Sequence, residues 1–296
     1  MPHVVTLIAD RAATALTPAV ILGVRDAIGG GEPVILSPGE AADIPVPAAP
    51  DIATMQAALA GAPIDTIVSS TENRRKHLLV ADMDSTIVTG ETLDELADFA
   101  GLKDRIAAIT ARAMNGELDF KSALRERVAM LRGLPVDSLE RTWQRVRLTA
   151  GARELVTTMR AHGAYTALVS GGFSFFTARV AAACGFDLHR SNVLLDDGSV
   201  LLGRVAEPIL DRDTKLATLQ GLASEHGLAL AATLAVGDGA NDLDMLRAAG
   251  LGVAFHARPI VAAAAQARVD HGNLRALLFA QGYRAEEIAG DLPRQS

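Results

Sequence analysis

The feature that most constrains the fold is a set of three short apolar runs, each of which breaks into polar or glycine residues. The runs and the residues that follow them are 78–81 before Asp82-Met83-Asp84-Ser85-Thr86, 164–169 before Ser170-Gly171-Gly172, and 233–236 before Gly237-Asp238-Gly239-Ala240-Asn241-Asp242. Continuous apolar strands separated by helical segments are typical of a parallel sheet that is covered on both faces. Such sheets bind ligands at the carboxyl ends of their strands. The sequence therefore predicts an α/β fold with a functional site where the three runs end.

The first 70 residues show a different pattern of short elements. The expected elements are strands over residues 4–9, 33–36 and 64–68 and helices over residues 16–28 and 51–59. This alternation predicts a small α+β domain over residues 1–72, with residues 73–296 as the second domain. The polar stretch of residues 69–76 between them reads as a linker, whose three basic residues are expected to be solvated.

A long helical segment separates the first two apolar runs. Residues 92–149 carry apolar side chains at helical spacing, such as Leu93 and Leu96. A connection of that length between neighbouring strands is more typical of a lid than of a crossover helix, so we expect a helical cap at about residues 91–149. Residues 193–202 are expected to form a hairpin with an Asp-Gly turn.

Charge and hydropathy exclude several classes of protein. The chain has 28 basic and 35 acidic residues and a net charge of −7. This balance makes it a poor candidate for binding phosphate backbones by bulk electrostatics, which requires a concentrated basic face. Its longest nearly apolar run, residues 228–236, is much shorter than the roughly 20 residues of a membrane-spanning helix. Asp10 and Arg11 interrupt the apolar N-terminal stretch, unlike a secretory signal, and the single cysteine, Cys184, fits a reducing compartment. We therefore expect a cytoplasmic protein that binds neither nucleic acid nor membrane.

Three aspartates are expected to meet at the carboxyl edge of the sheet. Asp82 and Asp84 lie two residues apart, so an extended backbone directs both side chains to the same side, and Asp238 follows another strand. Close carboxylates repel one another, which favours a shared proton or a bound cation. A set of oxygen ligands without histidine or cysteine suits Mg²⁺. The alternative is that the aspartates only cap the turns after the strands.

Ser170-Gly171-Gly172 and Lys215 are candidates for holding an anion. The hydroxyl and the unshielded backbone amides of the first segment could bind a phosphate where the chain turns from strand to helix, although Ser-Gly-Gly is also a common turn. Lys215 is expected near the start of a helix. A cation there opposes the helix dipole, so nothing in the local sequence stabilises its charge. The alternative for this residue is a solvated surface lysine.

Taken in order, these segments resemble the four motifs of the haloacid dehalogenase-like (HAD) phosphohydrolases. Within that superfamily the chain from about Arg75 onward resembles the phosphoserine phosphatases, also in residues 82–95 and 120–128. The N-terminal 70 residues resemble the ACT-like domain that some members carry. The resemblance implies a Rossmann-like HAD core with a parallel sheet, a helical cap insertion and a small N-terminal α+β (ACT-like) domain, which could be regulatory.

The resemblance also implies roles for the candidate residues around the phosphate. Asp82 is the nucleophile that forms an aspartyl-phosphate, and Asp84 is the general acid and afterwards the base. Mg²⁺ is held by the Asp82 carboxylate, the Asp84 backbone carbonyl and Asp238, and Asp242 orients this metal site. The residues implied to hold the phosphoryl group and the substrate are Ser170, Gly171, Lys215 and Asn241.

In the cap, the resemblance implies contacts with the rest of the substrate. Glu91 takes the substrate ammonium and Arg127 takes its carboxylate, since a planar guanidinium suits bidentate carboxylate binding. Met114 and Phe120 pack over the small substrate and help to exclude water. From the residues alone, Glu91 reads as an acidic residue of a first helical turn and Arg127 as part of a solvated helix face.

The activity implied by the resemblance is Mg²⁺-dependent hydrolysis of O-phospho-L-serine to L-serine and phosphate, the last step of serine biosynthesis. One alternative is a HAD phosphatase for another small phosphorylated metabolite. A second is an inactive amino-acid-sensing protein. The presence of the full set of Asp82, Asp84, Lys215 and Asp238 argues against this alternative. A homodimer is compatible with the resemblance.

Overall fold

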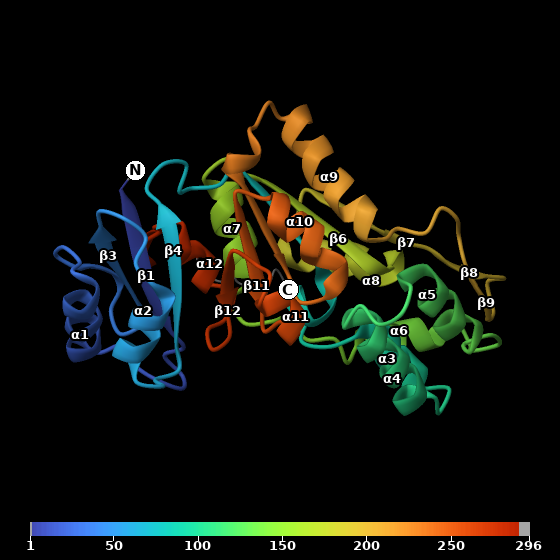
Figure 1. Cartoon of the computed structure of the whole chain (residues 1–296). Coiled ribbons are helices and arrows are strands. Elements are labelled where there is room, and N and C mark those ends of the chain that lie inside the picture. Colours follow the sequence, from blue (N-terminus) through green and yellow to red (C-terminus); the bar gives the residue numbers. More distant parts are fainter. Residues whose placement is uncertain (1, 290–296) are drawn as a thin grey trace.

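The computed structural model describes residues 2–289, which form a six-stranded sheet, a four-stranded sheet and a two-stranded hairpin (Figure 1). The larger sheet has the order β12-β11-β10-β5-β6-β7, and all its neighbouring strands are parallel. Its strands are β5 (Leu78–Ala81), β6 (Tyr165–Phe173), β7 (Leu188–Asn192), β10 (Thr233–Gly237), β11 (Leu251–Phe255) and β12 (Ala267–Val269). The three predicted apolar runs are β5, β6 and β10, and β5 lies between the other two. The predicted α/β fold with a parallel sheet is confirmed.

Helices cover both faces of this sheet, which explains the unbroken apolar runs. In β5, Leu78 and Val80 belong to one buried cluster, whereas Leu79 and Ala81 belong to the other. The helices are α9 (Arg212–Glu225), α10 (Leu243–Ala248) and α11 (Pro259–Ala262) on the first side and α7 (Ala152–Ala161), α8 (Ser174–Cys184) and α12 (Ala276–Ala280) on the second. Because alternate residues of a strand face opposite sides, a strand covered twice must be apolar at every position.

The segment between β5 and α7 is helical, as predicted, and its helices lie together at the lower right of Figure 1. They are α3 (Thr92–Asp98), α4 (Lys103–Met114), α5 (Phe120–Ala129) and α6 (Asp137–Trp143). The predicted hairpin is also present, formed by β8 (Leu194–Asp196) and β9 (Leu201–Val205), and β9 packs against α5. Short 3₁₀ turns occupy Leu230–Ala232, Ala240–Asp242 and Ala285–Glu287.

The N-terminal sheet is antiparallel and has the order β2-β3-β1-β4. Its strands are β1 (His3–Ala9), β2 (Val34–Ser37), β3 (Ala41–Val46) and β4 (Ile64–Ser70), with helices α1 (Pro18–Ile28) and α2 (Ile52–Leu59). The five predicted elements are present, but β3 was not predicted, because its sequence Ala-Ala-Asp-Ile-Pro-Val contains small residues, an aspartate and a proline. The division at residue 72 and the ACT-like nature of this part stay predictions.

The N-terminal sheet is fastened to the rest of the chain by buried charges. The Asp65 carboxylate accepts hydrogen bonds from the backbone N–H groups of Asp270, His271 and Gly272 at 2.7, 3.2 and 2.6 Å. Arg275 donates to the buried Glu40 at 2.7 Å. Carboxylates buried in this way are stable only when donors satisfy them, so these contacts fix the orientation of the sheet.

The expectation of a solvated basic linker at residues 69–76 is wrong. Strand β4 continues to Ser70, and the Arg74 guanidinium donates to both carboxylate oxygens of Asp43 at 2.6 and 2.8 Å. The Lys76 ammonium is also buried and donates to the Ala231 carbonyl oxygen at 2.7 Å. A charge pattern in sequence does not reveal such partners, because Asp43 and Ala231 are distant along the chain.

Within residues 2–289, every helix is too short or too polar to cross a lipid bilayer.

We predict that Asp65→Ala lowers the free energy of unfolding by about 2–4 kcal/mol, since three partly buried N–H groups lose a charged acceptor. Urea denaturation at neutral pH measures the change. Asp10→Ala is the matched control, because the Asp10 carboxylate accepts from one exposed N–H group, that of Ala12. Equal losses in the two variants would contradict the role of Asp65.

Candidate active site

Three neighbouring strands deliver the candidate residues to one edge of the sheet. Asp82 follows β5 directly, Asp238 follows β10, and Ser170 lies in the last part of β6. The Ser170-Gly171-Gly172 segment was expected beyond its strand, whereas β6 extends to Phe173 with an irregular register between Val169 and Phe173. The common edge follows from the parallel sheet, whose strands all end on the same side.

The chain turns sharply after β5, in a single π-helical turn at Met83–Ile87. The Val88 N–H donates to the Met83 carbonyl oxygen at 2.9 Å, while Asp84 stays extended and Ser85 has a positive φ of 54°. Turns of this kind and left-handed non-glycine residues are frequent at functional sites. The turn lets the carboxylates of Asp82 and Asp84 line the same pocket.

Lys215 is a buried cation that bridges two of the aspartates. Its Nζ lies 2.8 Å from Asp82 Oδ1 and 2.6 Å from Asp242 Oδ1. Burial by itself lowers the pKa of Lys215, but the charges of Asp242 and Asp82 outweigh burial and raise it. The lysine therefore stays charged. Its charge is stabilised by these two carboxylates, since the dipole of its own helix opposes a cation at this position.

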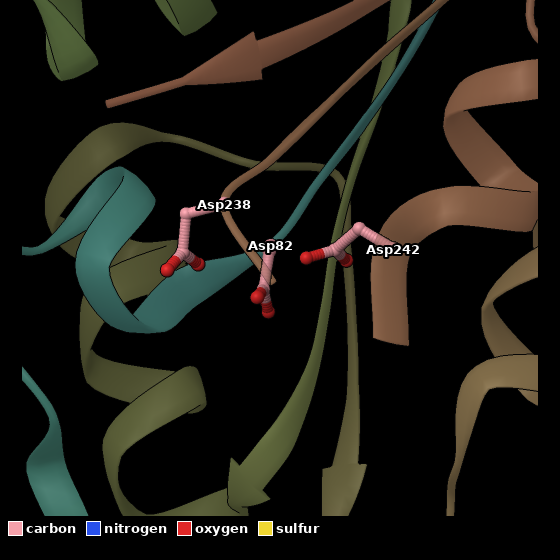
Figure 2. A group of neighbouring side chains, drawn as sticks. All are labelled: Asp82, Asp238 and Asp242. Carbon is pink, nitrogen blue, oxygen red and sulfur yellow. The ribbon is translucent and has the colours of Figure 1, made fainter. Parts of the chain in front are cut away.

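Asp82, Asp238 and Asp242 form a compact acidic group, in which one oxygen of each lies within 4.8 Å of the others. Figure 2 shows their carboxylates in a row with Asp82 in the middle. Burial, followed by the charges of Glu91 and Asp82, raises the pKa of Asp238 well above its usual value. Burial and the Asp82 charge raise the pKa of Asp242 to about 7. A cation is thus needed for all three to be ionised together.

The hydrogen bonds indicate which oxygens are available to that cation. Each oxygen of Asp242 already has a donor, because Lys215 binds its Oδ1 and the Gly239 N–H donates to its Oδ2 at 3.2 Å. Asp82 receives both Lys215 and the Met83 N–H on Oδ1. Within the described part of the chain, Asp82 Oδ2 and the Asp238 carboxylate have no hydrogen-bond donor. This donor set of hard oxygens fits a divalent ion such as Mg²⁺.

Asp84 is placed to hold and release a proton. Its carboxylate accepts from the Thr92 N–H at 2.8 Å and from the Ser170 hydroxyl at 3.4 Å. Burial raises its pKa to about 6, aided by the Asp82 charge and opposed by the hydrogen bond from Thr92. A carboxyl group with a pKa near neutrality can act as an acid in one step and as a base in the next.

Ten of the twelve candidate residues line one pocket at the carboxyl edge of the sheet. Its lining is Asp82, Asp84, Glu91, Leu93, Met114, Phe120, Leu124, Arg127, Ser170, Gly171, Gly172, Phe173, Asp238 and Asn241. The remaining two candidates, Lys215 and Asp242, are outside this lining and belong to the buried charge cluster around Asp82.

Three lining residues were not predicted as site residues. They are Leu93, Leu124 and Phe173. The helical pattern of the cap did not distinguish the two leucines, because it carries the same signal whether a side chain faces the core or a ligand. Phe173 directly follows the predicted Ser170-Gly171-Gly172 segment, and this adjacency was the available signal.

The glycines of the β6 end are required by close packing. A Cβ on Gly171 would lie 2.5 Å from the Phe120 ring, and a Cβ on Gly172 would lie 2.7 Å from Asp84 Oδ2. Both distances are far below van der Waals contact. A side chain at either position would therefore displace the cap phenylalanine or the acid.

An acidic and a basic side chain, Glu91 and Arg127, also line the pocket. Glu91 accepts a hydrogen bond from the Ser85 hydroxyl at 2.7 Å, and burial, with the Asp84 charge, raises its pKa to about 8. The Arg127 guanidinium is buried and donates to Thr110 Oγ1 at 2.8 Å and to the Ala123 carbonyl oxygen at 3.2 Å. Burial lowers the pKa of Arg127, while Asp94 and Glu91 oppose this change. These groups could bind a ligand that carries both a cation and an anion.

The sequence matches the model of the haloacid dehalogenase-like hydrolases over residues 79–247. The phosphoserine phosphatase of Archaeoglobus fulgidus is 45% identical over 205 residues, which are 69% of this chain. The chain spans 60% of the length of that relative.

Two solved structures are also similar. A phospho-aspartyl intermediate analogue of phosphoserine phosphatase has a TM-score of 0.66 and 38% identity, covering 69% of this chain and 98% of its own. A HAD family hydrolase from Salmonella enterica serovar Typhi has a TM-score of 0.82 and 27% identity, covering 98% of this chain and 99% of its own. The family match, which includes the acidic group and Lys215, establishes that the chain belongs to the haloacid dehalogenase-like hydrolases.

Proposed function

We propose that this protein is a Mg²⁺-dependent phosphatase that hydrolyses O-phospho-L-serine to L-serine and phosphate. The observation that carries the proposal is one pocket lined by Asp82, Asp84 and Asp238 and also by Glu91 and Arg127. A phosphorylated amino acid carries a phosphate, an ammonium and a carboxylate group, and the last two are opposite in charge to an ionised Glu91 and to Arg127. The A. fulgidus relative and the intermediate analogue, both phosphoserine phosphatases by name, support this substrate.

In the proposed reaction, the Asp82 carboxylate attacks the phosphorus atom and the bond from phosphorus to the serine oxygen breaks. Asp84 gives its proton to that oxygen, which leaves as the hydroxyl of serine. Asp84 then takes a proton from a water molecule, whose oxygen attacks the aspartyl-phosphate and releases phosphate. The pKa of about 6 at Asp84 suits both proton transfers, and the carboxylates of Asp82 and Asp84 line the same pocket.

Donors of the protein would hold the transferred phosphoryl group. The Ser170 hydroxyl oxygen accepts the Gly172 N–H at 2.9 Å, and its proton, directed at Asp84 over a long 3.4 Å, would turn to a phosphoryl oxygen when the substrate binds. The Gly171 amide and Lys215 would supply further positive charge as the transition state develops. Asn241 has a buried Oδ1 without a hydrogen-bond partner in the pocket, which suits a contact with the substrate.

The metal in this proposal is Mg²⁺, held by Asp82, Asp238 and the Asp84 backbone carbonyl, with Asp242 and Lys215 keeping Asp82 in place. When bound, Mg²⁺ would reduce the repulsion between the carboxylates and a phosphate dianion. The unpartnered Asp238 carboxylate supports this assignment.

Glu91 and Arg127 would recognise the amino-acid end of the substrate. Glu91 would ionise on binding the ammonium group, and Arg127 would donate two parallel hydrogen bonds to the carboxylate. Met114 and Phe120 would cover the substrate and exclude water. A phosphatase for another small metabolite would use the same chemistry. The presence of both Glu91 and Arg127 in the pocket favours an amino acid as the rest of the substrate.

The same proposal includes the division into an ACT-like domain of residues 1–72, with a possible regulatory role, and a phosphatase domain of residues 73–296 with its cap at about 91–149. It also includes a homodimer in the cytoplasm. The family resemblance supports these points.

We expect Asp82→Asn to reduce phosphoserine turnover at least about 10³-fold, because an amide oxygen is a poor nucleophile. Phosphate release measures turnover, and circular dichroism checks the fold. Asp104→Asn, which neutralises an exposed acid in the cap, is the control. A variant that keeps more than a trace of activity would remove Asp82 as the nucleophile.

We expect EDTA to abolish the activity and Mg²⁺ to restore it. Calorimetric titration with Mg²⁺ should show binding to the wild-type protein and binding at least about tenfold weaker to Asp238→Asn, which loses an ionised oxygen ligand. Asp104→Asn again serves as the control. Activity that persists after thorough chelation, or equal Mg²⁺ affinity in both proteins, would contradict the metal assignment.

We expect Arg127→Ala to reduce kcat/KM for phosphoserine about 100-fold, and to reduce that for p-nitrophenyl phosphate far less, because this substrate has no carboxylate. Arg125→Ala is a matched control on the same helix, where the exposed Arg125 pairs with Glu207. Equal losses for the two substrates would exclude the carboxylate contact.

A further inference from the structure

Three cap helices meet in one buried chain of hydrogen bonds that ends at Arg127. Asp94 lies on α3, Thr110 on α4 and Arg127 on α5. The Thr110 hydroxyl donates to Asp94 Oδ1 at 2.7 Å, and Arg127 Nη1 donates to Thr110 Oγ1 at 2.8 Å. All three side chains are at most 8% exposed. Water therefore does not compete strongly for these bonds.

Because a threonine hydroxyl has a single proton, these hydrogen bonds run in one direction, from Arg127 to Thr110 to Asp94. Thr110 Oγ1 also lies 3.1 Å from the Ile106 carbonyl oxygen of its own helix, but the Asp94 carboxylate is closer and charged. With its proton directed at Asp94, the hydroxyl presents a lone pair to Arg127. Asp94 thus decides which way the threonine points, and the threonine decides where one arm of the guanidinium lies.

The hydroxyl also keeps two opposite charges apart. Among residues 2–289, no carboxylate lies within 4.0 Å of the Arg127 guanidinium, and Arg127 Nη2 has no hydrogen-bond acceptor. The negative charge of Asp94 still acts on the arginine across space, because it opposes the lowering of the Arg127 pKa by burial. A direct ion pair would occupy the fork that a ligand needs, whereas this arrangement orients the fork and leaves it open to the pocket.

We propose that Asp94 and Thr110 are positioning residues for substrate selection, which act by holding Arg127 ready for the carboxylate of the substrate. This inference rests on the proposed function. A guanidinium has many rotamers, and a binding site gains affinity when the productive one is fixed before the ligand arrives. The effect should therefore be confined to substrates that carry a carboxylate.

The test compares phosphoserine with phosphoethanolamine, which has the same phosphate and ammonium groups but no carboxylate. Thr110→Val removes the hydroxyl while keeping the shape of the side chain. We expect it to lower the ratio of kcat/KM for phosphoserine to that for phosphoethanolamine about tenfold, mainly through KM. Asp94→Asn should lower the same ratio, and Thr110→Ser should restore it.

Thr142→Val is the matched control. Thr142 is also a buried threonine on a cap helix, but its hydroxyl donates only to the Ser138 carbonyl oxygen of the same helix, at 2.7 Å. We expect its substrate ratio to equal that of the wild-type protein. A merely structural role of Thr110 predicts equal losses for both substrates, and that result would overturn the proposal.

Wild-type kinetics separate this test from the proposed function. If the wild-type protein does not prefer phosphoserine over phosphoethanolamine, the proposed substrate is wrong. If it does, and Thr110→Val keeps the full preference, the proposed substrate stands and the positioning role is wrong.

Discussion

Repulsion between buried carboxylates at the carboxyl edge of the parallel sheet is the constraint on which the site depends. Asp82, Asp238 and Asp242 are brought together by the strand order, and burial strengthens their mutual repulsion. Lys215 compensates Asp82 and Asp242, but Asp238 has no such partner within residues 2–289. Buried charge persists only if it is paired or neutralised. Asp238 is therefore neutralised either by a proton or by a further cation, and the proposed Mg²⁺ would supply the second.

Arg127 meets the opposite constraint. It is a buried cation with no carboxylate within 4.0 Å in the described part of the chain, and the Thr110 hydroxyl separates it from Asp94, whose charge opposes the lowering of its pKa by burial. Burial raises the pKa of Glu91, which lines the same pocket, to about 8. In the proposed function, a ligand with both an ammonium and a carboxylate group would complement Glu91 and Arg127.

The sequence predicted the parts of the fold whose signal is local. Strands covered on both faces are apolar at every position, so β5 was visible, and the polar residues after the strands were grouped correctly at one edge. Strand β3 was missed because the buried Asp43 is explained by Arg74, a partner from outside its segment. For the same reason Lys215 had no local explanation. Thr110 carried no signal at all, because its role consists of contacts with two other helices.

Gly171 connects the end of β6 to the cap by packing. Its missing side chain is the space that the Phe120 ring occupies, and its amide is proposed to hold the phosphoryl group. Phe120 begins α5, the helix that also carries Arg127. The fit at Gly171 therefore helps to set where the guanidinium lies. In the proposed function, this packing would couple phosphate binding to substrate selection.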